Sequence, residues 1–412
     1  MIVTNIISAI GNNSSIYPLL VRDCCIEAPS KILIARKENL KESKEIANDA
    51  TREKIIDEYA TSGIWLGGIP MVEYFSDKFI SKKGYNPIVN LNLFKAEKNK
   101  EAYQGIEYNI NKFKNIQAKD VQDAVQDSIK VKNNKGSFEK LLTKKFCAAT
   151  IIPTIIMGFV LPKLNFALTK KIREKKVPQK AESKKEISFT GSFTSQIANL
   201  RTVDKMAISD GGLTVGRVTT SRNKDEAWAN AFRMIGSMIL NFVTPIYIAK
   251  GLDKLANKLF NINVNLDPKI LADNEFINTI KNSKVELPKS NTEKDLIDFI
   301  DNKPQALFSR FAQKTGKVSY LKSGYRDPRK FVDIKDLGKF RNEFENFIAK
   351  AKQSKNIENF ARKAKFVKSA NILANVGISS FLLAGVLPAA TYKFIKLTTG
   401  SYSDPGLVQN KK

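Results

Sequence analysis

A glycine-dense segment in the middle of the chain is the best candidate for binding chemistry. It has the sequence DGGLTVGRVTTSR over residues 210–222 and combines glycine amides with arginines and hydroxyl groups. Amides and arginines of this kind can hold a phosphate or a lipid headgroup. The residues of this hypothetical anion site are Gly211, Gly212, Gly216, Arg217 and Arg222. The simpler alternative is a tight turn that leads into a short hairpin, because β-prone residues follow the glycines.

A nucleotide-binding loop fits this segment poorly. The spacing from Gly211 to Gly216 matches the start of the GxxxxGK[ST] motif, but Arg217 replaces the lysine and Val218 replaces the hydroxyl that binds magnesium. The residues before the segment have the pattern of a helix rather than of a buried strand. We therefore expect no nucleotide, no metal and no other cofactor.

The absence of histidine limits the catalysis that the chain can perform. None of the 412 residues is histidine, which excludes a Ser-His-Asp triad, a Cys-His dyad and a HExxH zinc site. The three cysteines, Cys24, Cys25 and Cys147, form no CxxC pair, and such an odd number is typical of a reducing compartment. Because no set of catalytic residues stands out, we do not expect an enzyme.

Two pairs of adjacent carboxylates, Asp57-Glu58 and Asp225-Glu226, stand at the entrance of apolar segments. Such carboxylates can form a paired site for ions or protons. The alternative is that they enrich the first turn of a helix, where the helix dipole favours negative charge. Arg233 lies inside an apolar segment, and we expect it to pair with Glu226 or with Glu73.

The elements that would position these residues are four apolar segments. The two strong ones span residues 146–168 and 369–395, and the two weaker ones span residues 59–80 and 227–252. A helix needs about 20 apolar residues to cross ~30 Å of hydrocarbon. We predict a mainly α-helical membrane protein with two to four Pro-containing apolar helices and polar helical regions between them. Two other arrangements stay open: helices and re-entrant turns seated in one leaflet, or a soluble helical protein with very apolar core helices.

The sequence also has the pattern of a two-fold internal repeat. Both strong segments contain V-L-P followed by an aromatic residue and a lysine at equal spacing, starting at Val160 and at Val386. Matching pairs also occur in the same order in both halves. These pairs are Asp57-Glu58 with Asp225-Glu226, Pro70 with Pro245, and Asp77-Lys78 with Asp253-Lys254. The alternative is that lipid-adapted helices converge on Gly, Pro and terminal Lys.

The repeat sets the domain boundaries that we expect. Residues 1–168 form the first half, residues 169–192 a basic linker, residues 193–397 the second half, and residues 398–412 a disordered tail. Each half is expected to contain one weaker apolar helix, a polar helical region and one strong apolar helix.

The net charge of +27 predicts anionic partners. The lysines are spread over the polar segments rather than gathered on one stripe, so we expect membrane lipids or acidic proteins and not nucleic acid. The densest basic run follows a strong apolar segment, a pattern that stays cytoplasmic and binds anionic lipid. Its membrane-flanking residues are Lys170, Lys171, Arg173, Lys175 and Lys176. The alternative is a solvated tether without lipid specificity.

Three stretches resemble a family of uncharacterised bacterial membrane proteins. They are DEYATSGIWLGGIP at residues 57–70, GRVTTSRN at residues 216–223, and the terminal V-L-P segment. The resemblance covers most of the chain and implies a bacterial origin but no activity.

We therefore expect a protein of the bacterial inner membrane, with its basic regions in the cytoplasm. Its expected function is structural or interaction-based, through contact with anionic lipid or acidic partners. The alternative is a small transporter or channel built from two repeats of Pro-broken helices. A transporter should place the carboxylates at 57, 58, 225 and 226 and Arg233 around an interior, whereas a scaffold should leave them at the lipid–water boundary.

Overall fold

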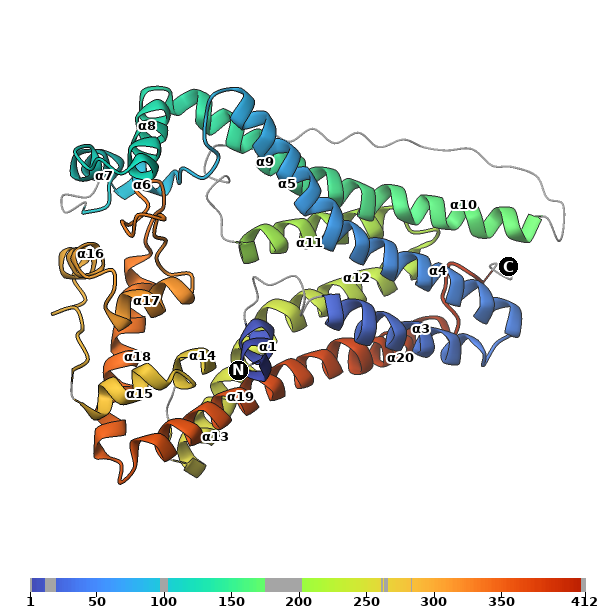
Figure 1. Ribbon diagram of the computed structural model, residues 1–412. Coiled ribbons are helices and arrows are strands. Elements are labelled where there is room, and N and C mark those ends of the chain that lie inside the picture. Colours follow the sequence, from blue (N-terminus) through green and yellow to red (C-terminus); the bar gives the residue numbers. More distant parts are fainter. Residues whose placement is uncertain are drawn as a thin grey trace. The chain divides into compact units, whose positions relative to one another are not determined.

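The computed structural model describes residues 2–11, 20–96, 103–174, 202–260, 262, 266–282 and 284–408 of the chain (Figure 1). These residues are mainly α-helical and include no β-strand, as the sequence predicts. The chain divides into two compact units. Unit 1 contains Met1–Ser8, Ser76–Leu142 and Leu252–Leu373, and unit 2 contains Ala9–Phe75, Thr143–Gly251 and Ala374–Lys412.

Each unit has its own set of helices. Unit 2 contains η1 (Val21–Glu27), α3 (Ala28–Asn39), α4 (Lys44–Gly63), η2 (Ile64–Gly68), η3 (Ile156–Val160), α10 (Leu161–Glu174), α11 (Thr202–Thr219), α12 (Lys224–Met238), η5 (Ile239–Val243), η6 (Leu382–Val386) and α20 (Leu387–Thr399). Unit 1 contains α6 (Asn92–Ala96), α7 (Ile106–Phe113), α8 (Lys119–Asn133), α14 (Pro268–Leu271), α15 (Asn274–Lys281), α16 (Glu293–Asn302), α17 (Leu307–Lys314) and α18 (Ile334–Gln353). The helices α1 (Ile2–Gly11), α5 (Ile69–Lys82), α9 (Lys135–Ile155), α13 (Thr244–Phe260) and α19 (Ile357–Phe381) contribute residues to both.

The elements named η are π-helical, and each one stands just before a proline. In each case the residue before the proline donates its amide to the carbonyl five residues earlier, for example Ile69 to Ile64 and Leu161 to Ile156. The other three donors are Ala28, Thr244 and Leu387. Proline lacks an amide hydrogen and crowds the carbonyl four residues earlier, so a wider turn lets the helix continue past it. At Pro70 the chain therefore forms a π-helical turn inside a continuous helix.

Three helices among the described residues are long and apolar enough to cross a membrane. They are Lys135–Glu174, Lys224–Phe260 and Ile357–Thr399, and each contains one π-helical turn. They include both strong segments and the weaker segment at 227–252. The weaker segment at 59–80 lies in α4, η2 and α5 and is not among these three.

Helix contacts within unit 2 occur in matched pairs, as a duplicated chain predicts (Figure 1). The pair α3 and α4 corresponds to α11 and α12, and the pair α4 and α10 corresponds to α12 and α20. The pair α11 and η3 corresponds to α3 and η6, so one helix of each half contacts the strong apolar helix of the other. One predicted match does not correspond in position. Asp57-Glu58 lies well inside α4, whereas Asp225-Glu226 lies in the first turn of α12.

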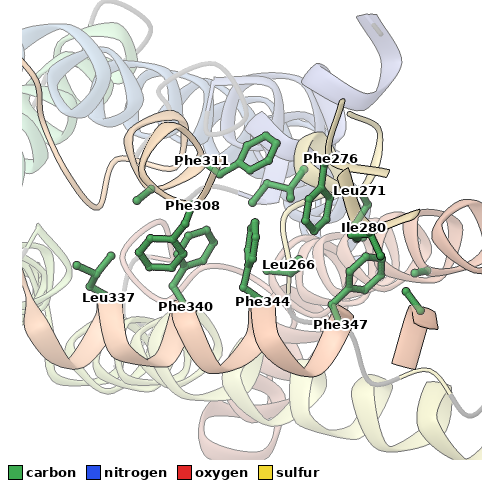
Figure 2. Close-up of a cluster of buried hydrophobic side chains, with 14 of the residues drawn as sticks. Leu266, Leu271, Phe276, Ile280, Phe308, Phe311, Leu337, Phe340, Phe344 and Phe347 are labelled. Atoms are coloured by element: carbon green, nitrogen blue, oxygen red, sulfur yellow. The ribbon is translucent and has the colours of Figure 1, made fainter. Parts of the chain in front are cut away.

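The largest cluster of buried apolar side chains lies in unit 1 (Figure 2). Phe340, Phe344 and Phe347 belong to α18, and Figure 2 shows their rings on one side of it. The ring centroid of Phe344 lies 4.8 Å from that of Phe276 and 5.9 Å from that of Phe308. Aromatic rings at such distances pack favourably, so α18 organises this core.

A buried arginine joins two distant parts of the unit 1 sequence. Arg326 is fully buried and binds Asp301 through Nε at 2.7 Å and Nη2 at 3.2 Å. Its Nη2 also donates to Asn109 at 3.0 Å. An isolated antiparallel bridge joins Arg326 to Tyr320.

The predicted linker and tail have different outcomes. Residues 169–174 continue α10, and residues 175–192 lie outside the described residues. The tail was predicted to be disordered, but α20 continues to Thr399 and residues 400–408 fold back onto unit 2. In this C-terminal segment, Leu407 is 3% exposed. Two backbone carbonyls of the segment accept hydrogen bonds from unit 2: that of Leu407 from Arg173 and that of Pro405 from Asn223. Residues 409–412 lie outside the described residues.

We predict that Phe344→Ala destabilises the protein by about 3–5 kcal/mol, because it leaves a cavity among packed rings. The free energy of unfolding in detergent micelles measures the effect. Phe366→Ala is the matched control, since Phe366 is 72% exposed. Equal losses for both variants would contradict this account of the core.

Candidate functional site

The predicted glycine-dense loop is a helix. Gly211, Gly212 and Gly216 lie in α11, where their amides belong to the helix and do not form an anion-binding loop. Two of these glycines allow close packing against the strong apolar helix of the first half. A Cβ on Gly216 would lie 2.8 Å from the backbone of Gly158, and one on Gly212 would lie 2.7 Å from the Thr154 side chain. A Cβ on Gly211 would have no other atom of the protein within 4 Å.

Arg217 has partners within the chain. Its Nη1 donates to Asp57 Oδ2 at 2.6 Å, and its Nη2 donates to Thr61 Oγ1 at 3.0 Å. Burial disfavours the charged guanidinium, but the Asp57 carboxylate outweighs this effect and raises the pKa of Arg217. A carboxylate of α4 therefore takes the place that we predicted for a bound anion.

Arg222 is held in the same way. Its Nη1 and Nη2 bind the two carboxylate oxygens of Glu53 at 2.9 and 3.0 Å, and Nη2 also binds Glu226 at 2.7 Å. The guanidinium carbon lies 4.1 Å from the centre of the Phe166 ring. Two carboxylates and one aromatic face thus surround this arginine, which is a geometry that suits guanidinium better than ammonium.

A second cluster lies between α3 and α4. Glu58 accepts from Lys31 Nζ at 3.2 Å and from Lys54 Nζ at 2.7 Å, and Lys31 also binds Glu27 at 3.1 Å. Burial opposes the charged form of all these groups. For Glu58 the two lysines outweigh burial and lower its pKa, and for Lys31 the two carboxylates raise its pKa. Burial, helped by Arg233, lowers the pKa of Lys54.

Further ion pairs connect α4 to α10. Arg173 Nε donates to Asp49 at 2.7 Å, and Arg52 donates to both Asp49 and Thr169. Arg173 is thus paired inside unit 2, although we predicted it to flank a membrane. Of the other predicted flanking residues, Lys170 lies 3.7 Å from Glu174, Lys171 is exposed, and Lys175 and Lys176 lie outside the described residues.

The C-terminal segment, residues 400–408, covers this network. The Asp404 carboxylate accepts from Tyr392 at 2.9 Å and from the buried Asn39 at 3.1 Å, and Asn223 donates to the carbonyl of Pro405 at 2.8 Å. Gly406 lies directly against the Arg222 ion pair, because a Cβ there would lie 2.3 Å from Arg222 Nε. Only glycine fits at this point without a shift of the chain.

The predicted carboxylate pairs have different environments. Asp57, Glu58 and Glu226 lie inside unit 2 with arginine or lysine partners, whereas Asp225 is exposed in the first turn of α12. Glu226 is paired with Arg222 instead of Arg233. Arg233 donates to Asn230 and forms no ion pair with another described residue.

The outer surface of the same bundle is apolar. In the 18-residue apolar stretch of each long helix, 39% of the residues are buried in Lys135–Glu174, none in Lys224–Phe260 and 33% in Ile357–Thr399. The exposed large side chains include Ile152, Ile155, Val160, Trp228, Ile235, Ile239, Ile246, Phe381 and Val386. Unit 2 therefore has charged pairs inside and apolar residues outside, the reverse of a soluble bundle.

Sequence reasoning missed Glu53, Lys31 and Lys54 as members of this network. The four-residue spacing of Glu27 with Lys31 and of Lys54 with Glu58 was an available signal for these pairs. The pair of Arg222 with Glu53 had no such signal, because it depends on the packing of one half against the other.

We predict opposite effects for two glycine substitutions in α11. Gly216→Ala should destabilise the protein by about 1–3 kcal/mol, because its methyl group would press on backbone atoms of Gly158. Gly211→Ala should stabilise it by up to about 1 kcal/mol, because alanine favours a helix and the site is open. Thermal unfolding in detergent measures both. Shifts of the same sign would reject the helical packing of this segment.

We also predict that Glu58→Gln costs about 3–5 kcal/mol, because it removes the paired carboxylate of the buried Lys54 and one of the two carboxylates that bind Lys31. Asp225→Asn removes the same charge from an exposed position and should cost less than about 1 kcal/mol. Adding Lys54→Met to Glu58→Gln should recover part of the loss. SDS titration of the folded protein measures the series, and no recovery in the double variant would contradict the pairing.

No family model, curated protein or solved structure matches this chain. Its function must therefore be inferred from the geometry of unit 2 and from the charge distribution of the chain.

Proposed function

We propose that the chain is an integral membrane protein whose unit 2 lies in the lipid bilayer. The distribution of side chains in unit 2 is the observation that supports this proposal. Ionisable groups such as Arg217, Asp57 and Glu58 are paired in its interior, and large apolar side chains cover the outside of three helices long enough to span. Lipid tolerates such an exterior, and water does not.

The ends of the long helices favour full spans over re-entrant turns in one leaflet. The helices contain 40, 37 and 43 residues, more than the roughly 20 that hydrocarbon requires. Basic residues stand beside exposed apolar ones near one end of each strong apolar segment. Near Leu164 these are Lys163 and Lys170, and near Phe366 they are Arg362 and Lys363. Long basic side chains extend to the water from such positions.

The role we propose is that of a scaffold that contacts anionic lipid or acidic partners. Arg217, Arg222 and Arg173 are neutralised by carboxylates of the chain itself, so they stabilise the bundle instead of binding a substrate. The excess of 27 positive charges over the chain remains for external partners. We place the protein in the bacterial inner membrane with its basic regions in the cytoplasm, which agrees with the preference of basic segments for that side.

A small transporter is the second candidate, because the ion pairs of Arg217 with Asp57 and of Arg222 with Glu53 join the two halves of the repeat. Transporters built from repeats commonly place their sites between the repeats and interrupt their helices there. Asp57 and Glu58 lie inside unit 2, as this candidate requires. Ion flux through reconstituted vesicles, abolished by Asp57→Asn, would favour transport over the scaffold.

We predict that the full-length protein stays in the membrane pellet after alkaline carbonate extraction. Removal of residues 146–168, 227–252 and 369–395 together should release it, because these segments form the three helices that are long and apolar enough to span. A matched deletion of part of the linker, residues 175–192, should leave it in the pellet. Full-length protein in the supernatant would reject the membrane location.

A further inference from the structure

Three helices carry the same small arrangement near the end of an apolar segment. An exposed aromatic ring stands one turn from a basic residue in each case. On α5 the ring of Phe79 lies 5.7 Å from Lys83 Nζ, and on α13 the ring of Tyr247 lies 5.7 Å from Lys250 Nζ. On α19, Phe366 follows Arg362 and Lys363 at four and three residues. We call these three arrangements the basic–aromatic ends.

The rings are unusual in their exposure. Phe79 is 52% exposed, Tyr247 is 68% exposed and Phe366 is 72% exposed, although each helix also has a buried side. In water, these rings would leave apolar area uncovered for no gain. At a membrane surface, aromatic rings of this kind lie at the level of the headgroups.

The position of each ring along its helix agrees with the level of the lipid headgroups. Phe366 stands three residues before the apolar segment 369–395, which is about 4.5 Å along a helix. Phe79 stands in the last turn of the segment 59–80, and Tyr247 stands close to the end of the segment 227–252. The headgroup region on each side of a bilayer is roughly 5–8 Å thick, so each ring fits within or beside it.

We infer that the basic–aromatic ends bind the phosphate groups of anionic lipids, with the rings in the boundary of the acyl chains and the ammonium or guanidinium groups on the phosphates. This inference rests on the proposed membrane location. Two observations favour lipid over an acidic protein as the partner. The cations stand directly beside apolar rings. The helices α13 and α19 belong to candidate spans, and α5 continues the weaker apolar segment 59–80.

The test uses the full-length protein in vesicles of phosphatidylcholine and phosphatidylglycerol. Spin-labelled versions of both lipids report the fraction of lipid whose motion the protein restricts. The wild-type protein should restrict phosphatidylglycerol several-fold more strongly than phosphatidylcholine at low salt. The preference should weaken at high salt, because the contact is electrostatic.

A quadruple variant should reduce the ratio of restricted phosphatidylglycerol to restricted phosphatidylcholine to near one. Its substitutions are Lys83→Gln, Lys250→Gln, Arg362→Gln and Lys363→Gln. The matched control replaces four exposed lysines of unit 1 that lie away from the apolar segments: Lys284, Lys289, Lys322 and Lys335, each by Gln. The control should keep the wild-type preference despite the same loss of charge. An unchanged preference in the first variant, or an equal loss in the control, would overturn the inference.

The same spectra separate this inference from the proposed function. If the protein restricts the motion of phosphatidylcholine, it lies in the bilayer, whether or not it prefers phosphatidylglycerol. If neither lipid is restricted, the membrane location itself is rejected. If both are restricted equally by the wild-type protein, the location stands and the basic–aromatic ends do not bind anionic lipid.

Discussion

A charge that leaves water needs an opposite charge beside it, and unit 2 is arranged around this constraint. Arg217, Arg222 and Arg173 come from α11, from the connection to α12 and from α10, and each meets a carboxylate of α4. Replacement of such pairs by apolar residues is often neutral for stability, but separation of a pair is costly. The pairs therefore determine which helices are neighbours more than how stable the bundle is.

Proline imposes the second constraint on the same helices. A proline inside an α-helix leaves one carbonyl without its donor, and lipid offers no replacement. The chain meets this need with a π-helical turn before Pro70, Pro162, Pro245 and Pro388. The turn occurs at the same place relative to proline in both halves.

The sequence predicted the helices better than it predicted the site. Apolar length identified the long helices, because this pattern is local. The glycine-dense segment was interpreted as a loop, because isolated glycine disfavours a helix. Tertiary packing reversed that preference. Position 216 must be glycine because its backbone lies against that of Gly158, which is far away in the sequence. Likewise, Arg217 and Arg222 have the composition of an anion site, and only the fold shows that Asp57 and Glu53 occupy it.

The contacts of residues 400–408 have a consequence for biosynthesis. This segment follows α20 in the chain, yet it supplies partners for Asn39 on α3 and for Arg173 on α10. While the ribosome is still translating the second half, those two side chains have nothing from this segment to bind and must stay hydrated or be protected by other proteins. Closure of this network thus follows the synthesis of residues 400–408, and shorter nascent chains are more open to proteases there than the folded protein is.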